Sequence, residues 1–287
     1  MELIIKSDGG KTVHSTNEWE VLCPPLGHSD QWVDKRSAKE LAKSVFETGT
    51  LPEIINEVLS DMNISLPSEM WGIPEKQTSL PWAQYGKRKH DLWLYDIHSE
   101  VAVSIEAKTD ESFDRKLSQK RATSAKKNSD GGANMNTRLD GILDYLYQGN
   151  PPKYKDELYY QLLSATTGAI LEAKSNGINR VAVVFLVFKS DILSTRKLKT
   201  NEEAWELFCD SLGINYSGGM IQRDNVDCFI TKREIQLSSH NYHISKPRGL
   251  LIFFAIAIIP LVKLTCPQKG VNIILYSDGT SNKVIEK

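Results

Sequence analysis

The sequence predicts an α/β fold in which helices flank a mixed central β-sheet. Apolar residues recur at helical spacing in some segments and at alternate positions or in continuous runs in others, and the two kinds of segment alternate along the chain. With 287 residues, 40% of them hydrophobic and 25% charged, the chain can bury a core and has an ordinary globular composition. We expect one domain over residues 1–238 and a hydrophobic C-terminal tail over residues 239–287.

Two helices are expected before residue 63. Ser37-Ala-Lys-Glu40 has the pattern of a capping box, and apolar residues follow it at helical spacing as far as Gly49. A second helix over residues 51–62 carries a Pro near its start, where Pro is favoured. Residues 66–82 contain Pro and Trp, and their pattern does not distinguish strand from loop.

The clearest strands cover residues 91–97 and 101–108, joined by a short polar turn. Side chains alternate between the faces of a strand, so Glu106 and Lys108 share one face while Ala107 points to the other. If the connecting loop has two or four residues, Asp91 lies directly opposite Glu106. A loop of three residues would weaken this pairing.

Three helices and one further strand are expected after the strand pair. Residues 114–132 form a mobile loop or an exposed helix, and a helix follows over residues 136–149 with Asn136 as its N-cap. A long helix covers residues 156–176, and the continuous apolar run at 181–188 predicts a strand that is buried on both faces. A last helix over residues 200–213 opens with a capping box.

The charged ends of the strand pair predict a metal site. Asp91 and Glu106, held opposite each other, repel unless a cation lies between them, and Mg²⁺ or Mn²⁺ prefers such oxygen ligands. The ion would polarise a phosphodiester and lower the pKa of a bound water, which Lys108 could orient. The alternative is a surface salt-bridge cluster, but these charges interrupt apolar strands at their ends, which favours the metal site.

The same residues resemble the PD-(D/E)xK nuclease superfamily. Asp91-Leu-Trp-Leu-Tyr-Asp96 and Val103-Ser-Ile-Glu-Ala-Lys-Thr-Asp-Glu111 look like its motif, and the expected order of elements agrees with its restriction-endonuclease-like αβββαβ core. More narrowly, five stretches between about residues 20 and 215 look like a bacterial restriction-endonuclease-like family. They are the segment with Pro24-Pro25 and Trp32 that runs into Arg36 to Ala42, then Glu106 to Phe113, Asn136 to Leu139, Tyr160 to Thr166 and Val183 to Phe188. The resemblance implies that Asp91 and Glu106 bind metal and that Lys108 assists the attacking water.

The resemblance also provides two secondary candidates and has departures. Gln161 matches a Gln on the helix after the triad in related exonucleases, although Ala165 replaces the Tyr expected four residues later. Glu40 is the positional equivalent of a Glu that some members use as a metal ligand, and its capping-box role explains it equally well. His90 stands where the superfamily name has Pro, and the resemblance ends near residue 240, so the tail is divergent.

A basic segment follows the triad. Residues 115–127 contain six cations and no acid, and they could track a phosphate backbone or form a solvated helix face. Arg138 could contact phosphate or form a structural salt bridge. The nucleic-acid-binding candidates are Arg115, Lys116, Lys120, Arg121 and Arg138.

We therefore expect a Mg²⁺-dependent endo- or exonuclease that acts on nucleic acid, DNA in particular, in bacterial DNA defence or repair. The alternative is a catalytically inactive nuclease-fold module that binds nucleic acid or a protein partner. Because 35 Lys and Arg nearly balance 36 Asp and Glu, any nucleic-acid contact is confined to patches. Scattered cysteines, the absence of an export signal and an apolar run at 249–262 that is short for a bilayer favour a cytoplasmic protein without membrane contact.

Overall fold

The computed structural model describes residues 1–25, 32–82, 87–98, 100–109, 111–126, 130–189, 195–237, 242–245, 273–277 and 282–286. The chain divides into two compact units, Met1–Gly249 and Leu250–Lys287. The described part of the second unit is a hairpin of β12 (Ile273–Ser277) and β13 (Asn282–Glu286). The boundary expected after residue 238 and the apolar run at 249–262 lie outside the described residues.

The first unit alternates strands and helices along the chain. In order, its elements are β1 (Glu2–Lys6), β2 (Thr12–Val13), α1 (Thr16–Leu22), α3 (Ser37–Phe46), α4 (Thr50–Asp61), β3 (Glu69–Pro74), β4 (Gln77–Thr78), β5 (Arg88–Lys89), β6 (Leu92–Asp96), β7 (Ala102–Lys108), α5 (Leu117–Ala125), α6 (Asp130–Tyr147), the 3₁₀ turn η1 (Lys155–Glu157), α7 (Tyr160–Ser175), β8 (Arg180–Lys189), α8 (Thr195–Leu212), β9 (Gly219–Arg223), β10 (Val226–Leu237) and β11 (Tyr242–Ser245).

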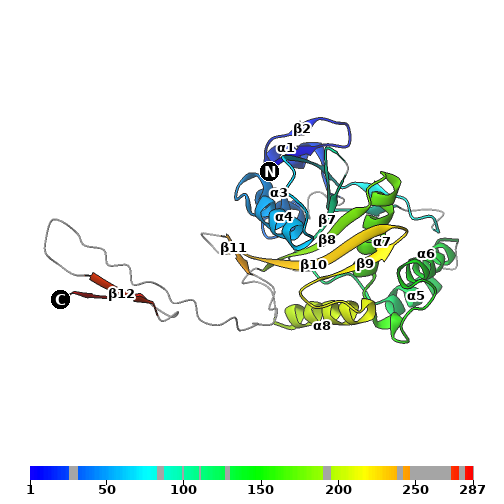
Figure 1. Cartoon of the computed structure of the whole chain (residues 1–287). Coiled ribbons are helices and arrows are strands. Elements are labelled where there is room, and N and C mark those ends of the chain that lie inside the picture. The colour runs from blue at the N-terminus through cyan, green and yellow to red at the C-terminus, as the bar shows by residue number, and fades with distance from the viewer. Residues whose placement is uncertain are drawn as a thin grey trace. The chain divides into compact units, whose positions relative to one another are not determined.

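A mixed sheet of nine strands runs through this unit (Figure 1). Its order is β11-β10-β8-β7-β6-β3-β1-β2, and β9 also pairs with β10. β3, β6 and β7 form an antiparallel meander, whereas β8 is parallel to β7 and β10 is parallel to β8. A separate small ribbon joins β4 to β5. The α/β class and the mixed, helix-flanked sheet are therefore confirmed.

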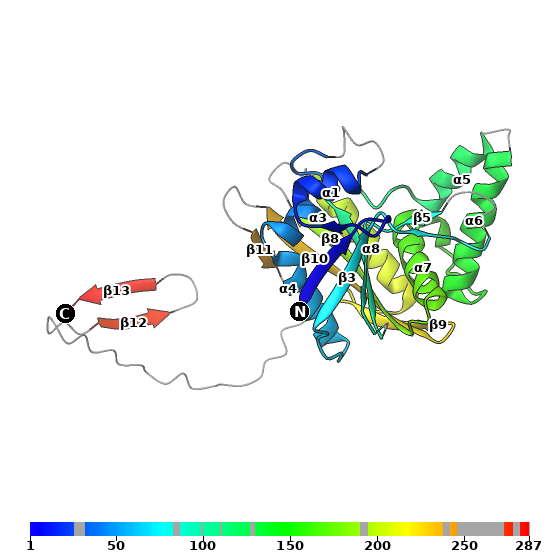
Figure 2. The ribbon, with the colours of Figure 1, turned by 90° about the horizontal axis from the view of Figure 1, so that it is seen from above.

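Helices cover both faces of the sheet, as Figures 1 and 2 show. On one face α1, α3 and α4 enclose one apolar core, and on the other α5 to α8 enclose a second core. The alternation expected along β7 is present, because Val103, Ile105 and Ala107 belong to the first core and Ala102 to the second. Glu106 and Lys108 consequently lie on the α7 side of the sheet.

The strands predicted at 91–97, 101–108 and 181–188 are confirmed to within one residue, but several helix starts differ. α7 begins at Tyr160 rather than at residue 156, because Leu158 and Tyr160 are hydrogen-bonded to Leu117, the first residue of α5, and to Arg115 just before it. Leu117 N–H donates to Leu158 O at 2.9 Å, and Tyr160 N–H donates to Arg115 O at 3.0 Å. The expected caps Asn136 and Thr200 lie inside α6 and α8, since backbone hydrogen bonds continue each helix toward its N-terminus. Among the described residues, no helix has the length and apolarity needed to cross a membrane.

The capping box predicted at Ser37 and Glu40 is wrong. Arg36 is the N-cap of α3 and makes no side-chain capping bond. The Ser37 hydroxyl instead donates to Glu111 Oε1 at 2.9 Å, across 74 residues of sequence. This long-range bond joins α3 to the segment that follows β7.

Phe185 is central to the packing beneath the candidate site, because it lies beside Glu106 in the sheet and contacts Phe113, Trp205 and Phe208. Since its ring is fully buried, we expect Phe185→Ala to lower the free energy of unfolding by about 3–5 kcal/mol. Urea unfolding would measure the change. Phe229→Ala, at a partly buried ring on β10, is the control and should cost clearly less. Equal losses would contradict the packing described.

Candidate active site

Asp91 and Glu106 lie opposite each other where β6 and β7 meet. Leu92 pairs with Ile105, and the antiparallel register continued by one residue places Asp91 opposite Glu106. The backbone N–H of Ala107 donates to Asp91 Oδ2 at 2.7 Å, which fixes the Asp91 carboxylate against the end of β7. Asp96 N–H donates to Val101 O at 3.1 Å, which leaves a loop of four residues, 97–100, between the strands. This is one of the two loop lengths for which the pairing of Asp91 with Glu106 is expected.

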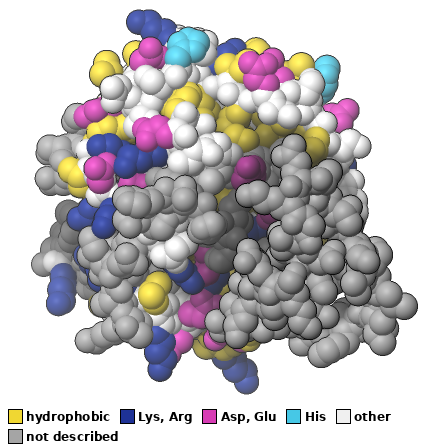
Figure 3. Space-filling model, turned by 90° about the vertical axis from the view of Figure 1, so that its left-hand side faces the viewer, with side chains coloured by type: hydrophobic (Ala, Val, Ile, Leu, Met, Phe, Trp, Pro, Cys, Tyr) yellow, Lys and Arg dark blue, Asp and Glu magenta, His cyan; other side chains and the backbone are white. Residues whose placement is uncertain are grey.

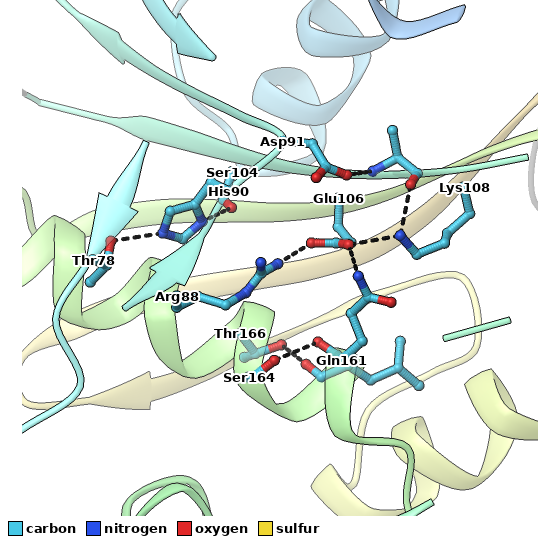
Figure 4. A network of polar contacts seen from close by, with 12 residues as sticks. Thr78, Arg88, His90, Asp91, Ser104, Glu106, Lys108, Gln161, Ser164 and Thr166 are labelled. Carbon is cyan, nitrogen blue, oxygen red and sulfur yellow. Dashed lines mark hydrogen bonds and ion pairs between the residues drawn. The ribbon is translucent and has the colours of Figure 1, made fainter. Parts of the chain in front are cut away.

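Three donors converge on the Glu106 carboxylate, as Figure 4 shows. Lys108 Nζ donates to Oε1 at 2.9 Å, and Gln161 Nε2 donates to the same oxygen. Arg88 Nη2 donates to the other oxygen, Oε2. The donors come from β7, α7 and β5, so three separate segments of the chain meet at this one carboxylate.

Glu106 has no exposed surface, yet its surroundings favour the ionised form. Burial alone would raise the pKa of Glu106, but the charges of Arg88 and Lys108 outweigh that effect and hold its pKa below the ordinary value. Burial likewise opposes the charge of Lys108, and Glu106 and Asp91 raise the pKa of Lys108 above its ordinary value. The three groups therefore form a buried, charged cluster at neutral pH.

Asp91 has a different environment from Glu106. Desolvation and the charge of Glu106 raise the pKa of Asp91 to about 7, and the opposing charges of Lys108 and Arg88 do not cancel these effects. Within the described part of the chain, Asp91 Oδ1 forms no hydrogen bond, while Oδ2 is bound to Ala107. Asp91 is thus the less compensated member of the carboxylate pair.

His90, directly before Asp91, forms part of a buried polar chain. Its Nδ1 lies 2.8 Å from Ser104 Oγ, and its Nε2 lies 2.9 Å from Thr78 Oγ1. Thr78 donates its single hydroxyl proton to Glu172 Oε2, so it accepts from Nε2–H of His90, and Ser104 donates to Nδ1. Burial and the charge of Arg88 lower the pKa of His90 well below its ordinary range. The two bonds of its neutral ring fix His90 in place, and with it the backbone directly before Asp91.

A cavity of about 280 Å³ opens onto Asp91, whereas Glu106, which has no exposed surface, does not line it. Its charged wall includes Asp91, Lys108 and Arg88, and its apolar wall includes Trp19 of α1 and Leu41 of α3. Cys23 also lines it, but burial raises the pKa of that thiol to about 11, so it is not a nucleophile at neutral pH. The cavity gives a small ligand access to the site.

The structure brings only one of the two secondary candidates to the triad. Gln161, the second residue of α7, reaches Glu106, whereas Glu40 does not line the cavity. Glu40 is 2% exposed, and its Oε1 accepts from Lys35 N–H at 2.8 Å and from Lys43 Nζ at 3.2 Å. Its carboxylate is therefore engaged at the start of α3.

The basic candidates lie on or near α5 and are largely engaged by acids. Lys116 pairs with Glu157, Lys120 with Asp114, and Arg121 with Asp140 and Asp156. Arg115 is exposed and bonds Thr123, and Arg138 is buried with its guanidinium 5.8 Å from the Tyr160 ring. These contacts agree with the alternative that the basic segment is a solvated helix face. Because acids already pair with Lys116, Lys120 and Arg121, less positive charge is available to a phosphate backbone.

Arg88 belongs to the site, but the sequence patterns do not predict it. It belongs to the two-residue strand β5, which is too short to give a periodic signal. The run Lys87-Arg88-Lys89-His90 lies immediately before Asp91. Such a basic run next to a site carboxylate indicates that one of its cations could pair with the acids of the site. The residue lies 18 positions from Glu106 in sequence.

The residues present fit a hard divalent cation in chemical type. Asp91 Oδ1 is unbound within the described residues, Glu106 is ionised, and the Ala107 carbonyl faces the same cluster through its bond from Lys108 Nζ at 2.9 Å. Among the described residues, however, no group of three or more His, Cys, Asp or Glu side chains could hold a metal. The groups that would hold such an ion are two carboxylates and one main-chain carbonyl, and Glu106 would have to release a donor to take part.

Comparison with protein families gives one match. A family model described as a domain of unknown function, DUF6946, matches residues 12–240. The chain belongs to this family. The matched region contains β2 to β10 of the main sheet and every residue of the candidate site, whereas β1 and β11 lie outside it. No curated protein and no solved structure matches the chain.

Removing the negative charge of Glu106 should lower the stability of the protein, because the buried cations Arg88 and Lys108 then lose their partner. Glu106→Gln leaves Arg88 and Lys108 facing a neutral amide, so we expect the free energy of unfolding to fall by about 3 kcal/mol. Urea unfolding at neutral pH would measure it. In the control, Glu157→Gln breaks the exposed pair with Lys116 and should cost less than about 1 kcal/mol. A loss no larger than the control's would mean that Glu106 is not the compensating charge.

The raised pKa of Asp91 predicts a pH dependence of stability. An acid whose pKa is higher in the folded than in the unfolded state contributes stability at low pH and loses it as the pH rises toward the folded pKa, here about 7. Asp91→Asn keeps an acceptor for Ala107 N–H but does not ionise. Between about pH 5 and about pH 8 we expect the wild type to lose on the order of 2 kcal/mol relative to this variant. Urea unfolding at several pH values gives the comparison, and parallel pH profiles would contradict it.

Proposed function

We propose that this chain is a metal-dependent phosphodiesterase that hydrolyses nucleic acid, built on a restriction-endonuclease-like core. The observation that supports this most is the juxtaposition of Asp91 and Glu106 in register at the strand ends, with Lys108 beside them and a cavity that Asp91 and Lys108 line. DNA is the expected substrate, in defence or repair.

The order of elements supports the proposed core. A helix (α4) precedes an antiparallel meander (β3, β6 and β7), a helix (α7) follows it, and a strand (β8) then pairs in parallel with the last strand of the meander. This is the αβββαβ order that the sequence resemblance implies. The charged residues lie at the end of the meander that faces α7, beside the cavity.

The residues of the site have complementary tasks in this proposal. Asp91, Glu106 and the Ala107 carbonyl would hold Mg²⁺ or Mn²⁺, and the bound ion would supply Lewis-acid polarisation and a water of lowered pKa. Lys108 Nζ, already bound to Glu106 Oε1 and the Ala107 carbonyl, lies where it can orient the attacking water or stabilise developing negative charge. Gln161 fixes the rotamer of Glu106 from α7.

One observation favours the alternative, a catalytically inactive module that binds nucleic acid or a protein. Both oxygens of Glu106 already accept hydrogen bonds, and two of the donors are cations, so the buried charge is compensated by the protein itself. A cluster with a purely structural role needs no metal ion in addition to these donors. A purely structural cluster does not require the adjacent cavity, nor an Asp91 oxygen that forms no hydrogen bond within the described residues.

Because 35 Lys and Arg nearly balance 36 Asp and Glu, nucleic-acid contact outside the cavity is confined to patches in this proposal. On the face shown in Figure 3, Lys and Arg side chains are interspersed with Asp and Glu side chains and form no continuous basic surface among the described residues. The basic segment around α5 is engaged by Glu157, Asp114, Asp140 and Asp156. Exposed ion pairs of this kind are weak, so a phosphate backbone can still replace the carboxylates at modest cost.

The proposal predicts metal-dependent cleavage that requires Asp91 and Lys108. With linear DNA, circular DNA and RNA as substrates, the wild type should cleave at least one of them in Mg²⁺ or Mn²⁺ and not in excess chelator. Asp91→Asn and Lys108→Ala should each lower the rate by at least about 100-fold. Lys174→Ala, at an exposed cation that pairs with Asp224 and lies outside the cavity, is the control and should keep the wild-type rate within about threefold.

Circular dichroism would establish that each variant is folded. Asp91→Asn is the more informative variant, because its amide keeps the bond from Ala107 N–H. Equal cleavage by the wild type and a folded Asp91→Asn protein would contradict the proposal. Binding of nucleic acid without cleavage under any metal condition would favour the inactive module.

A further inference from the structure

Arg88 is held by features that are specific to its side chain. Its stem packs against α7 at Gly168, where an added Cβ would lie 2.9 Å from Arg88 Cγ, so a larger residue in the helix would displace the arginine. Its guanidinium reaches Glu106 Oε2, and its Nε is buried without a hydrogen-bond partner in the described part of the chain. Glu106 is therefore the principal partner that keeps the guanidinium in place.

The donors on Glu106 differ in how readily they can be released. Lys108 belongs to the same strand and is also bound to the Ala107 carbonyl, and Gln161 shares Oε1 with it. Among the described residues, Arg88 alone occupies Oε2, and it comes from a two-residue strand outside the main sheet. The cavity of about 280 Å³ that Arg88 lines offers space into which its guanidinium can move.

We propose that Arg88 is an internal counter-ion that occupies the metal-binding oxygen of Glu106 until a divalent cation displaces it. Metal binding is then a competition between the guanidinium and the ion for Oε2. In the metal-free protein Arg88 compensates the buried charge, and in the metal-bound protein its guanidinium lies in the cavity. This inference rests on the proposed function and concerns how the same site is filled.

The test is a titration of the full chain with Mn²⁺ alone. Electron paramagnetic resonance measures the free Mn²⁺, and calorimetry measures the heat of binding. Arg88→Met keeps the stem that packs at Gly168 and removes the competing donor. We expect its Kd for Mn²⁺ to be at least about tenfold lower than that of the wild type. Without metal the variant should be less stable than the wild type, and it should gain more stability from a given Mn²⁺ concentration.

Lys89→Met is the matched control. Lys89 follows Arg88, lines the same cavity and carries the same charge, but its Nζ pairs with Glu75 at 3.0 Å and not with Glu106. Its Kd for Mn²⁺ should stay within about threefold of the wild type, since no direct competitor is lost. If Arg88→Met does not fold, Arg88→Gln, which removes the charge but keeps a donor, is measured in its place.

The outcomes separate this inference from the proposed function. Tighter Mn²⁺ binding in the Arg88 variant alone, abolished by adding Asp91→Asn, supports the competition. An unchanged or higher Kd in the Arg88 variant, or an equal gain in Lys89→Met, overturns it while leaving a metal site in place. If neither the wild type nor any variant binds Mn²⁺, the proposed metal-dependent function fails, and the competition fails with it.

Discussion

The buried charge of Glu106 is the constraint on which the site depends. A carboxylate with no exposed surface is costly unless cations and hydrogen bonds compensate it, and here Arg88, Lys108 and Gln161 do so. These donors come from β5, β7 and α7, so the β4–β5 ribbon and the first turn of α7 are both tied to the end of the sheet. The chain of Ser104, His90, Thr78 and Glu172 adds a second link between α7 and the ribbon.

The two carboxylates of the site are compensated unequally, and this difference connects the packing to the proposed chemistry. Glu106 is surrounded by donors and its pKa is lowered, whereas Asp91 is desolvated beside Glu106 and its pKa is raised to about 7. A divalent cation would relieve the repulsion that raises the pKa of Asp91. It would also make Arg88 redundant as a counter-ion. In the proposed function, either the Arg88 guanidinium or a metal ion would compensate the pair.

The sequence predicted the parts of the fold that repeat a local pattern. Alternation in β6 and β7 gave the shared face of Glu106 and Lys108 and the pairing with Asp91, and the continuous apolar run gave β8. Helical spacing gave α3, α4 and α7, although the start of α7 is set by backbone bonds to Arg115 and Leu117, which no local pattern contains.

The parts that the sequence did not predict depend on contacts between distant residues. Ser37 bonds Glu111 instead of capping its own helix, and the cations of α5 meet acids that lie before, beside and after the helix. Arg88 reaches Glu106 from a strand of two residues, which is too short for periodicity to detect. The longest strand, β10, was also not anticipated. Composition and spacing describe each segment alone, whereas these features arise when segments pack.

The most direct measurement is an anomalous-difference map from crystals of the wild type grown with Mn²⁺. The account predicts a peak between the Asp91 and Glu106 carboxylates, at about 2.0–2.3 Å from an oxygen of each, with the Arg88 guanidinium no longer on Glu106 Oε2. A map at saturating Mn²⁺ without a peak at this position, and with Arg88 still bound to Glu106, would contradict the central claim that this carboxylate pair is a metal site.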